Sequence, residues 1–226
     1  MTRDNRPGSL TASRKHMDAF CSDLAEGLHA VAQPLTIVQN ELSPGRIEEL
    51  SESDLRQSVS RSAVEIERVS SLFGILRQLV AIERFTPELE NLVSTDLIAE
   101  AIDGVDRLYE EREIGLTVKP DGSYNLMAHR KRALQSLSIS LLTACVLSKP
   151  GHVVEISTCR MSQYVSIDIQ NPLLELKYLD AHNKLVMTLV ESSVQGQRGK
   201  FGYELKPFAA QIRFRKASSS MGVPGE

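Results

Sequence analysis

Hydrophobic positions in the first third of the chain follow a three-and-four spacing, which is typical of helices that pack along one face. In the first segment the repeated apolar residues are Leu24, Leu28, Val31, Leu35, Val38 and Leu42. The pattern stops at Ser43-Pro44-Gly45, a strong helix breaker. We therefore expect a helix from about Ser13 to Leu42.

A second helix is expected to begin near Ser51 or Ser53, since either serine can cap the first turn, and to continue to about Arg84. Its apolar positions are Val59, Ile66, Val69, Phe73, Leu76 and Val80. The two helices should form an antiparallel hairpin, which alone covers only part of two wide apolar stripes. A second copy would complete a four-helix bundle, so we expect a homodimer.

The pattern changes after Phe85-Thr86-Pro87, where shorter helices and alternating strands follow. The expected helices span 94–111 (capped by Ser94 or Thr95), 132–147 and 185–194, and the expected strands span 115–119, 125–127, 153–159, 164–169, 200–205 and 209–215. This order implies a mixed sheet with helices packed on one face. The fold class is therefore α+β, with an N-terminal helical hairpin followed by a small α/β sandwich.

Four segments follow from these elements. We expect a disordered tail over 1–12, a helical-hairpin domain over 13–86, an α/β domain over 92–216 and a second disordered tail over 217–226. The two tails are assigned from their polar, turn-forming residues.

Composition narrows the class of partner. The 226 residues carry a net charge of −3, which gives no case for nucleic-acid binding. No apolar run approaches the roughly 20 residues that cross a bilayer, and the N-terminus lacks the apolar core of a signal peptide. Three distant cysteines have neither disulfide nor zinc spacing, and the isolated histidines predict no metal site. We expect a cytoplasmic protein with no membrane partner.

One histidine stands apart from the apolar pattern of the first helix. His29 and Gln33 are one turn apart, so both side chains leave the helix on the same side. Pro34 follows inside the helix, where a proline costs about 3 kcal/mol and removes a backbone hydrogen bond. A helix that keeps this proline is expected to be shaped around His29.

These residues resemble the H-box of the histidine-kinase core, in which a dimerising phosphotransfer hairpin precedes a GHKL-type ATP-binding domain. The family pattern is a histidine, usually an acid next, a Thr or Asn four positions later, then Pro-Leu. Here the stretch reads His29, Ala30, Gln33 and Pro34-Leu35. The resemblance covers residues from about 18 to 216 and implies that His29 is the phosphoacceptor.

The second half resembles the GHKL domain in element order and departs from it in chemistry. Ala144 occupies the position of the magnesium-binding asparagine, and alanine has no oxygen for a hard cation. Asp168 is expected on the sheet surface rather than at the strand end, and no glycine occurs from Asn171 to Val194. The resemblance therefore implies a degenerate domain that binds no ATP and has no cofactor of its own.

Together these features resemble the ChpT-type histidine phosphotransferases. The resemblance implies a phosphorelay protein that passes a phosphoryl group between His29 and response-regulator receiver domains, with Mg²⁺ supplied by the receiver. Gln33 is a candidate for positioning water or phosphate, and Glu26 for orienting the ring in place of the missing acid at Ala30. Two alternatives stay open: a non-catalytic dimeric scaffold that binds a regulator, and a diverged ATP-dependent sensor kinase.

Overall fold

The computed structural model describes residues 22, 25, 27–48, 50–83 and 88–217, and the chain divides into two compact units, 1–78 and 79–226. The predicted N-terminal tail, the predicted start of the first helix and nearly all of the predicted C-terminal tail lie outside the described residues. The predicted domain bounds stay predictions.

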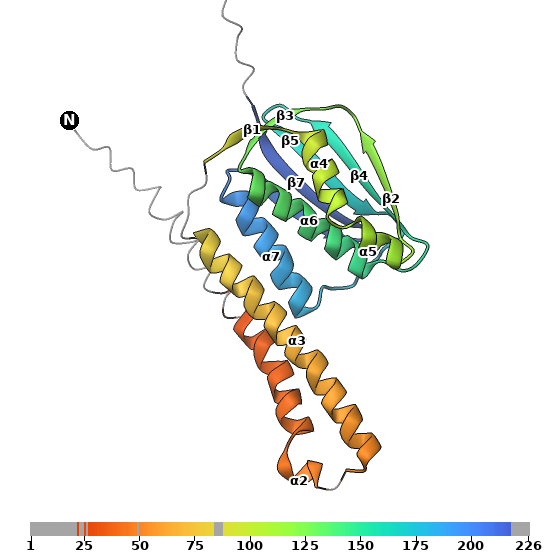
Figure 1. Ribbon diagram of the computed structural model, residues 1–226. Helices are drawn as coiled ribbons and strands as arrows, with labels where there is room; N and C mark the ends of the chain where they lie inside the picture. The colour runs from red at the N-terminus through yellow and green to blue at the C-terminus, as the bar shows by residue number, and fades with distance from the viewer. Residues whose placement is uncertain (1–21, 23–24, 26, 49, 84–87, 218–226) are drawn as a thin grey trace, which may run out of the picture. The chain divides into compact units, whose positions relative to one another are not determined.

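The first unit contains the expected helical hairpin (Figure 1). Its first helix is described continuously over 27–41, and α3 spans Glu52–Glu83. Ser51 caps α3 as predicted: its hydroxyl accepts a hydrogen bond from the Asp54 N–H over 3.3 Å. The breaker at Ser43 ends the first helix, but Pro44 then begins the one-turn helix α2 (Pro44–Ile47), which the sequence analysis did not predict.

The second unit is built on one mixed sheet, as predicted. Its order is β1-β3-β7-β5-β4-β2, and β6 also pairs with β7, on the same edge as β3 but along a different part of the strand. Only β2 and β4 run parallel; the remaining pairs are antiparallel. The strands are β1 (Glu90–Val93), β2 (Gly115–Pro120), β3 (Asn125–Ala128), β4 (Val153–Arg160), β5 (Tyr164–Asn171), β6 (Lys200–Leu205) and β7 (Phe208–Lys216).

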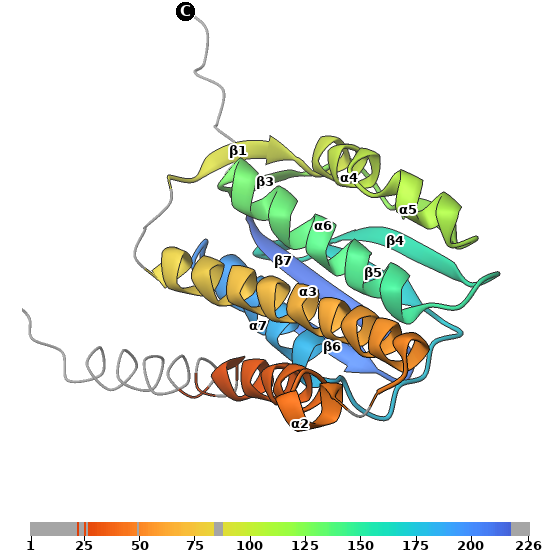
Figure 2. The same ribbon diagram turned by 60° about the horizontal axis from the view of Figure 1, so that its bottom comes forward.

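Helices cover one face of this sheet (Figures 1 and 2). They are α4 (Ser94–Asp103), α5 (Asp106–Glu111), α6 (Arg130–Leu147) and α7 (Ala181–Gln195). Alternate residues of the central strands point into the layer between sheet and helices, where burial of apolar surface stabilises the fold. This core includes Val165, Ile167 and Ile169 of β5 and Phe208, Ala210, Ile212 and Phe214 of β7.

The prediction of a single helix over 94–111 was wrong. The segment breaks at Gly104, where the Val105 N–H turns back to the Ile102 carbonyl over 2.8 Å, and α5 starts afresh. Glycine costs about 1 kcal/mol in a helix, so the break is favoured there. The predicted cap was also wrong: the Ser94 hydroxyl accepts from the Tyr124 N–H over 3.0 Å instead.

One short strand was missed, and two helices begin earlier than the sequence pattern indicates because polar side chains cap them. β1 was missed, since its four residues do not alternate. α6 begins two residues early because the His129 ring accepts from the Arg132 N–H. α7 begins four residues early because the Asp180 carboxylate accepts from the Asn183 N–H over 2.7 Å. Caps made by histidine or by an aspartate in a loop leave little periodic signal.

Candidate functional site

The imidazole of His29 is exposed on the outer side of the hairpin's first helix. Gln33, one turn further on, is exposed on the same side. Both side chains line a shallow, open hollow, together with Ala32, Thr36 and Ile37. The structure therefore brings His29 and Gln33 together as the spacing predicted.

Pro34 lies on the inner face of the same helix. It is buried together with Gly27 and Val31, whereas His29 and Gln33 are exposed. The helix stays continuous through Pro34, although the proline has no N–H to offer the Ala30 carbonyl four residues earlier. Pro34 thus forms part of the buried inner face, and the helix that carries His29 continues past it.

The polar groups beside His29 are an amide and a hydroxyl. Thr36, which the sequence analysis missed, lies seven residues from His29 on the same side of the helix and lines the hollow. Its Oγ1 donates a hydrogen bond to the Ala32 carbonyl over 2.9 Å. No carboxylate lines the hollow among the described residues, and the candidate orienting acid, Glu26, lies outside them. Gln33 is the group best placed to hold a water or a phosphoryl oxygen.

In the second unit, the position expected for a magnesium ligand is closed. Ala144 lies on α6 in the core and is fully buried. A methyl group without exposure offers neither an oxygen nor access to a cation. Asp168 lies in the middle of β5, opposite Ser157 of β4 and Gln211 of β7, and its carboxylate accepts from the Ser166 hydroxyl over 3.0 Å.

The residue at the end of β5 is Asn171, which is fully buried. Its side-chain amide donates to the Ser148 hydroxyl over 2.6 Å and lies 3.1 Å from Nδ1 of His152. Its side-chain carbonyl accepts from the Leu173 N–H over 3.0 Å. Both the nitrogen and the oxygen of this buried amide are therefore engaged within the chain.

The segment after β5 is held to the β6–β7 hairpin. The Leu174 carbonyl accepts from the Phe208 N–H over 2.8 Å, and the Leu176 N–H donates to the Leu205 carbonyl over 2.8 Å. Leu174 itself is buried in the core. This nine-residue connection between β5 and α7 is thus fixed to the sheet at Leu174 and Leu176.

The described residues form neither a cluster of metal ligands nor a helix that could span a membrane. No group of three or more His, Cys, Asp or Glu side chains lies close enough together to hold a metal ion within the part of the chain that the structure describes. In the same part, every helix is too short or too polar to cross a bilayer.

No protein-family model matches this sequence, and no curated protein sequence matches it either. Solved structures do. The histidine kinase AdeS of Acinetobacter baumannii superposes with a TM-score of 0.62 at 18% identity, over 84% of this chain and 98% of that one. The histidine kinase ThkA, in complex with the response regulator TrrA, gives a TM-score of 0.71 at 13% identity, over 96% of this chain and 68% of that one.

A histidine kinase from Burkholderia phymatum gives a TM-score of 0.52 at 12% identity, over 88% of this chain and 99% of that one. At such identities the likeness concerns the fold, and the matched regions span both units of the chain. The chain therefore shares the fold of these structures, a helical hairpin followed by an α/β domain.

Proposed function

We propose that this protein is a histidine phosphotransfer protein of a two-component phosphorelay. It accepts a phosphoryl group at His29 from one response-regulator receiver domain and donates it to another, without ATP. The observation that carries the proposal is the exposure of His29 beside Gln33 on the hairpin of a histidine-kinase-like core. The structural neighbour ThkA was solved bound to a response regulator, which supports a partner of that class.

The proposed step needs little from this chain beyond a positioned ring. A ring nitrogen of His29 attacks the phosphorus of an aspartyl phosphate, so that an N–P bond forms and the P–O bond to the aspartate breaks. The aspartate leaves as a carboxylate, and the proton on the other nitrogen of the attacking ring passes to water. The receiver's own Mg²⁺ balances charge on the phosphoryl oxygens. The reverse step returns the group to a second receiver.

The second unit supports a route without ATP. Ala144 has no oxygen for magnesium, and the Asn171 amide is committed to Ser148, His152 and Leu173. Ala30, directly after His29, has no carboxylate to take the ring proton during autophosphorylation. We therefore assign the α/β domain to packing or docking rather than to nucleotide binding.

A phosphotransfer assay tests the proposal. Incubation with a radiolabelled, phosphorylated receiver domain should label this protein with an acid-labile, base-stable phosphate. The label should be lost in His29→Ala and kept in Asn40→Ala, which changes the same outer side of the helix three turns further on. Unchanged labelling of His29→Ala would remove the proposal. Binding of the receiver without transfer would favour the scaffold alternative.

Nucleotide binding is tested separately. Calorimetric titration with Mg-ATP should give no saturable heat, and incubation with labelled ATP should leave His29 unlabelled. Saturable binding together with labelling from ATP would favour the alternative of a diverged sensor kinase.

The exposed apolar residues of the hairpin support a homodimer. On the first helix, three exposed leucines each follow an inward-facing residue: Leu28, Leu35 and Leu42 follow Gly27, Pro34 and Glu41. On α3, three exposed apolar residues do the same: Val59, Ile66 and Phe73 follow Ser58, Glu65 and Leu72. Because the two helices run antiparallel, the same one-residue offset turns both sets to the same side of the hairpin.

The two sets also pair by level. Glu41 contacts Ser58 directly, so Leu42 and Val59, each one residue further along its antiparallel helix, lie within about 3 Å of the same level. Each seven-residue step back along the first helix is matched by seven residues forward along α3. Leu35 therefore lies level with Ile66, and Leu28 with Phe73. We call these three pairs the apolar layers, and we infer that a second copy of the chain covers them to complete a four-helix bundle.

A further inference from the structure

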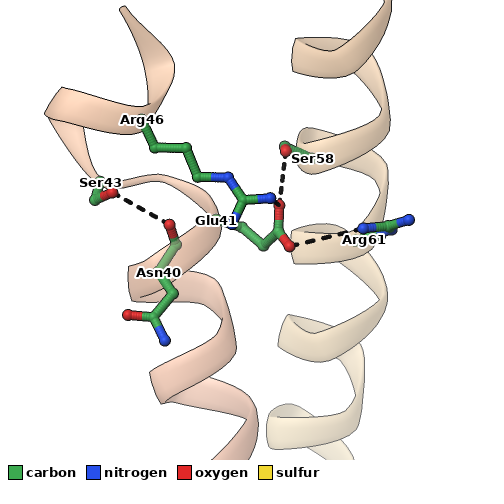
Figure 3. A network of polar contacts seen from close by, with 6 residues as sticks. All are labelled: Asn40, Glu41, Ser43, Arg46, Ser58 and Arg61. Carbon is green, nitrogen blue, oxygen red and sulfur yellow. Dashed lines mark hydrogen bonds and ion pairs between the residues drawn. The ribbon is translucent and has the colours of Figure 1, made fainter. Parts of the chain in front are cut away.

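A buried carboxylate joins three consecutive segments at the closed end of the hairpin (Figure 3). Glu41, in the last turn of the first helix, is only 9% exposed. Its Oε2 accepts a hydrogen bond from the Ser58 hydroxyl of α3 over 2.6 Å and lies 3.2 Å from Nη2 of Arg46 in α2. Its Oε1 lies 3.8 Å from Nη1 of Arg61. These four residues form the Glu41 cluster.

Such a cluster is expected to add little to the free energy of unfolding. The cost of removing a carboxylate from water roughly cancels the attraction of its partners, and well-packed apolar side chains often do as well or better. A buried polar group differs from an apolar one in being directional. It is satisfied only when its partners stand opposite it, so it can distinguish one alignment of two helices from another.

The apolar layers by themselves leave at least one wrong alignment open. Because they repeat every seven residues, a slide of α3 by seven residues would still pair Leu42 with Ile66 and Leu35 with Phe73. A slide by a single turn would destroy the layers, so the heptad slide is the alternative that matters.

The Glu41 cluster excludes that alternative. After a seven-residue slide, Glu65 would take the place of Ser58 opposite Glu41, and Arg68 would replace Arg61. The arginine is thus preserved, while a hydroxyl that donates to the carboxylate is exchanged for a second carboxylate. Two like charges at the inner face of the hairpin repel each other and leave Glu41 without its donor.

We propose that the Glu41 cluster fixes the register of the hairpin, so that a single set of three apolar layers faces the second copy of the chain. The consequence for the interface rests on the dimer proposed above. The register itself is a property of one chain, and its test is independent of both dimerisation and phosphotransfer.

Disulfide formation between pairs of engineered cysteines reports which residues of the two helices lie opposite each other. In a background with Cys21, Cys145 and Cys159 replaced by alanine, Leu42→Cys with Val59→Cys reports the native alignment. Leu42→Cys with Ile66→Cys reports the seven-residue slide. Seven residues rise about 10 Å along a helix, so a disulfide can close only in the alignment that brings its own pair together. Non-reducing electrophoresis separates closure within a chain from closure between chains.

With the cluster intact, the native pair should close within the chain and the slid pair should stay open. In Glu41→Leu/Ser58→Leu, which keeps the helices apolar and folded, the slid pair should close in a measurable fraction of chains. The matched control is Glu52→Leu/Arg56→Leu. It removes an exposed ion pair of 2.6 Å from α3, the helix that carries Ser58, and should leave the slid pair open.

Two outcomes would overturn the proposal. One is a slid pair that stays open in the cluster variant while circular dichroism shows a folded hairpin. The other is a slid pair that closes equally well with Glu41 and Ser58 in place. Glu41→Gln is a milder variant that removes the charge and keeps an acceptor. Its amide oxygen can still accept a hydrogen bond from Ser58, so the native cysteine pair should remain the one that closes.

Discussion

The side-chain amide of Asn171 donates a hydrogen bond of 2.6 Å to the hydroxyl of Ser148, which joins the end of β5 to the residue that follows α6. Ser148 in turn donates to the Ala144 carbonyl over 2.6 Å. The chain thus connects, through its own polar groups, the end of β5 to the last turn of α6, which contains Ala144.

Replacing Asn171 should therefore affect folding rather than nucleotide binding. Asn171→Ala removes three internal contacts: the Leu173 N–H loses its acceptor, and the Ser148 hydroxyl keeps its bond to the Ala144 carbonyl but loses the amide that donates to it. We expect the free energy of unfolding to fall by about 2–3 kcal/mol, measured by urea denaturation of the full chain. Asn91→Ala, at an exposed position of β1, should change it by less than about 0.5 kcal/mol. Equal losses in both variants would contradict the assigned role.

Tyr109 should make the protein sensitive to alkali. Its hydroxyl is buried and donates to the Leu141 carbonyl over 2.7 Å. Burial, with the Cys145 thiol nearby as a smaller cause, raises the pKa of Tyr109. Above pH ~10 the unfolded chain loses this proton while the folded chain keeps it, so the stability falls as the pH rises.

Tyr109→Phe removes that part of the pH dependence. At neutral pH we expect it to lower the free energy of unfolding by about 1 kcal/mol through the lost hydrogen bond. Between about pH 9 and 11 the difference in stability from the parent should shrink. Only in the parent does the unfolded chain gain free energy by ionising this phenol, so only the parent loses that part of its stability. Tyr178→Phe, at a side chain that is 75% exposed, is the control and should follow the parent curve. A constant difference at every pH would argue against the assignment.

Two valines of α3 provide a matched test of the dimer. Val59 and Val64 are 53% and 61% exposed, but Val59 belongs to the apolar layers and Val64 lies on the opposite side of the helix. Val59→Glu would bury two carboxylates per dimer and should weaken association at least roughly a hundredfold. Val64→Glu should leave it unchanged. Sedimentation equilibrium measures both, and equal effects would place the interface elsewhere.

Replacing Gln33 should distinguish phosphoryl transfer to His29 from hydrolysis of the receiver's aspartyl phosphate. If its amide holds a water against the receiver's aspartyl phosphate, Gln33→Ala should leave labelling of His29 intact and prolong the lifetime of the phosphorylated receiver. Thr36→Ala, at a neighbouring position of the same hollow, is the control. A receiver that loses phosphate at the same rate with either variant would leave Gln33 as a solvated surface residue.

Much of the architecture follows from local patterns. The ends of the hairpin helices at Ser43 and Ser51 could be predicted because a breaker and a cap act within one turn. Strands β4 to β7 could be predicted because alternation reports which face is covered. The exposure of His29 followed from its place off the apolar spacing, and that of Gln33 from the four residues between them.

Other features depended on contacts that no local pattern contains. Gly104 divides a segment whose apolar spacing is otherwise continuous, and β1 forms only because β3 lies beside it. The apolar positions of the hairpin looked like one seam per helix, but the structure separates an inner set from an exposed set. Which residues belonged to which set depended on the antiparallel partner helix.

The sequence by itself determined the hairpin and most of the later helices and strands, the side of the helix that His29 occupies and the loss of an oxygen at position 144, since these are properties of spacing and residue type. Only the tertiary structure decided that Asn171 is bound to Ser148 and His152, and that Glu41 meets Ser58, Arg46 and Arg61. The physical reason is that a hydrogen bond depends on where two distant segments come to lie, whereas periodicity describes each segment alone.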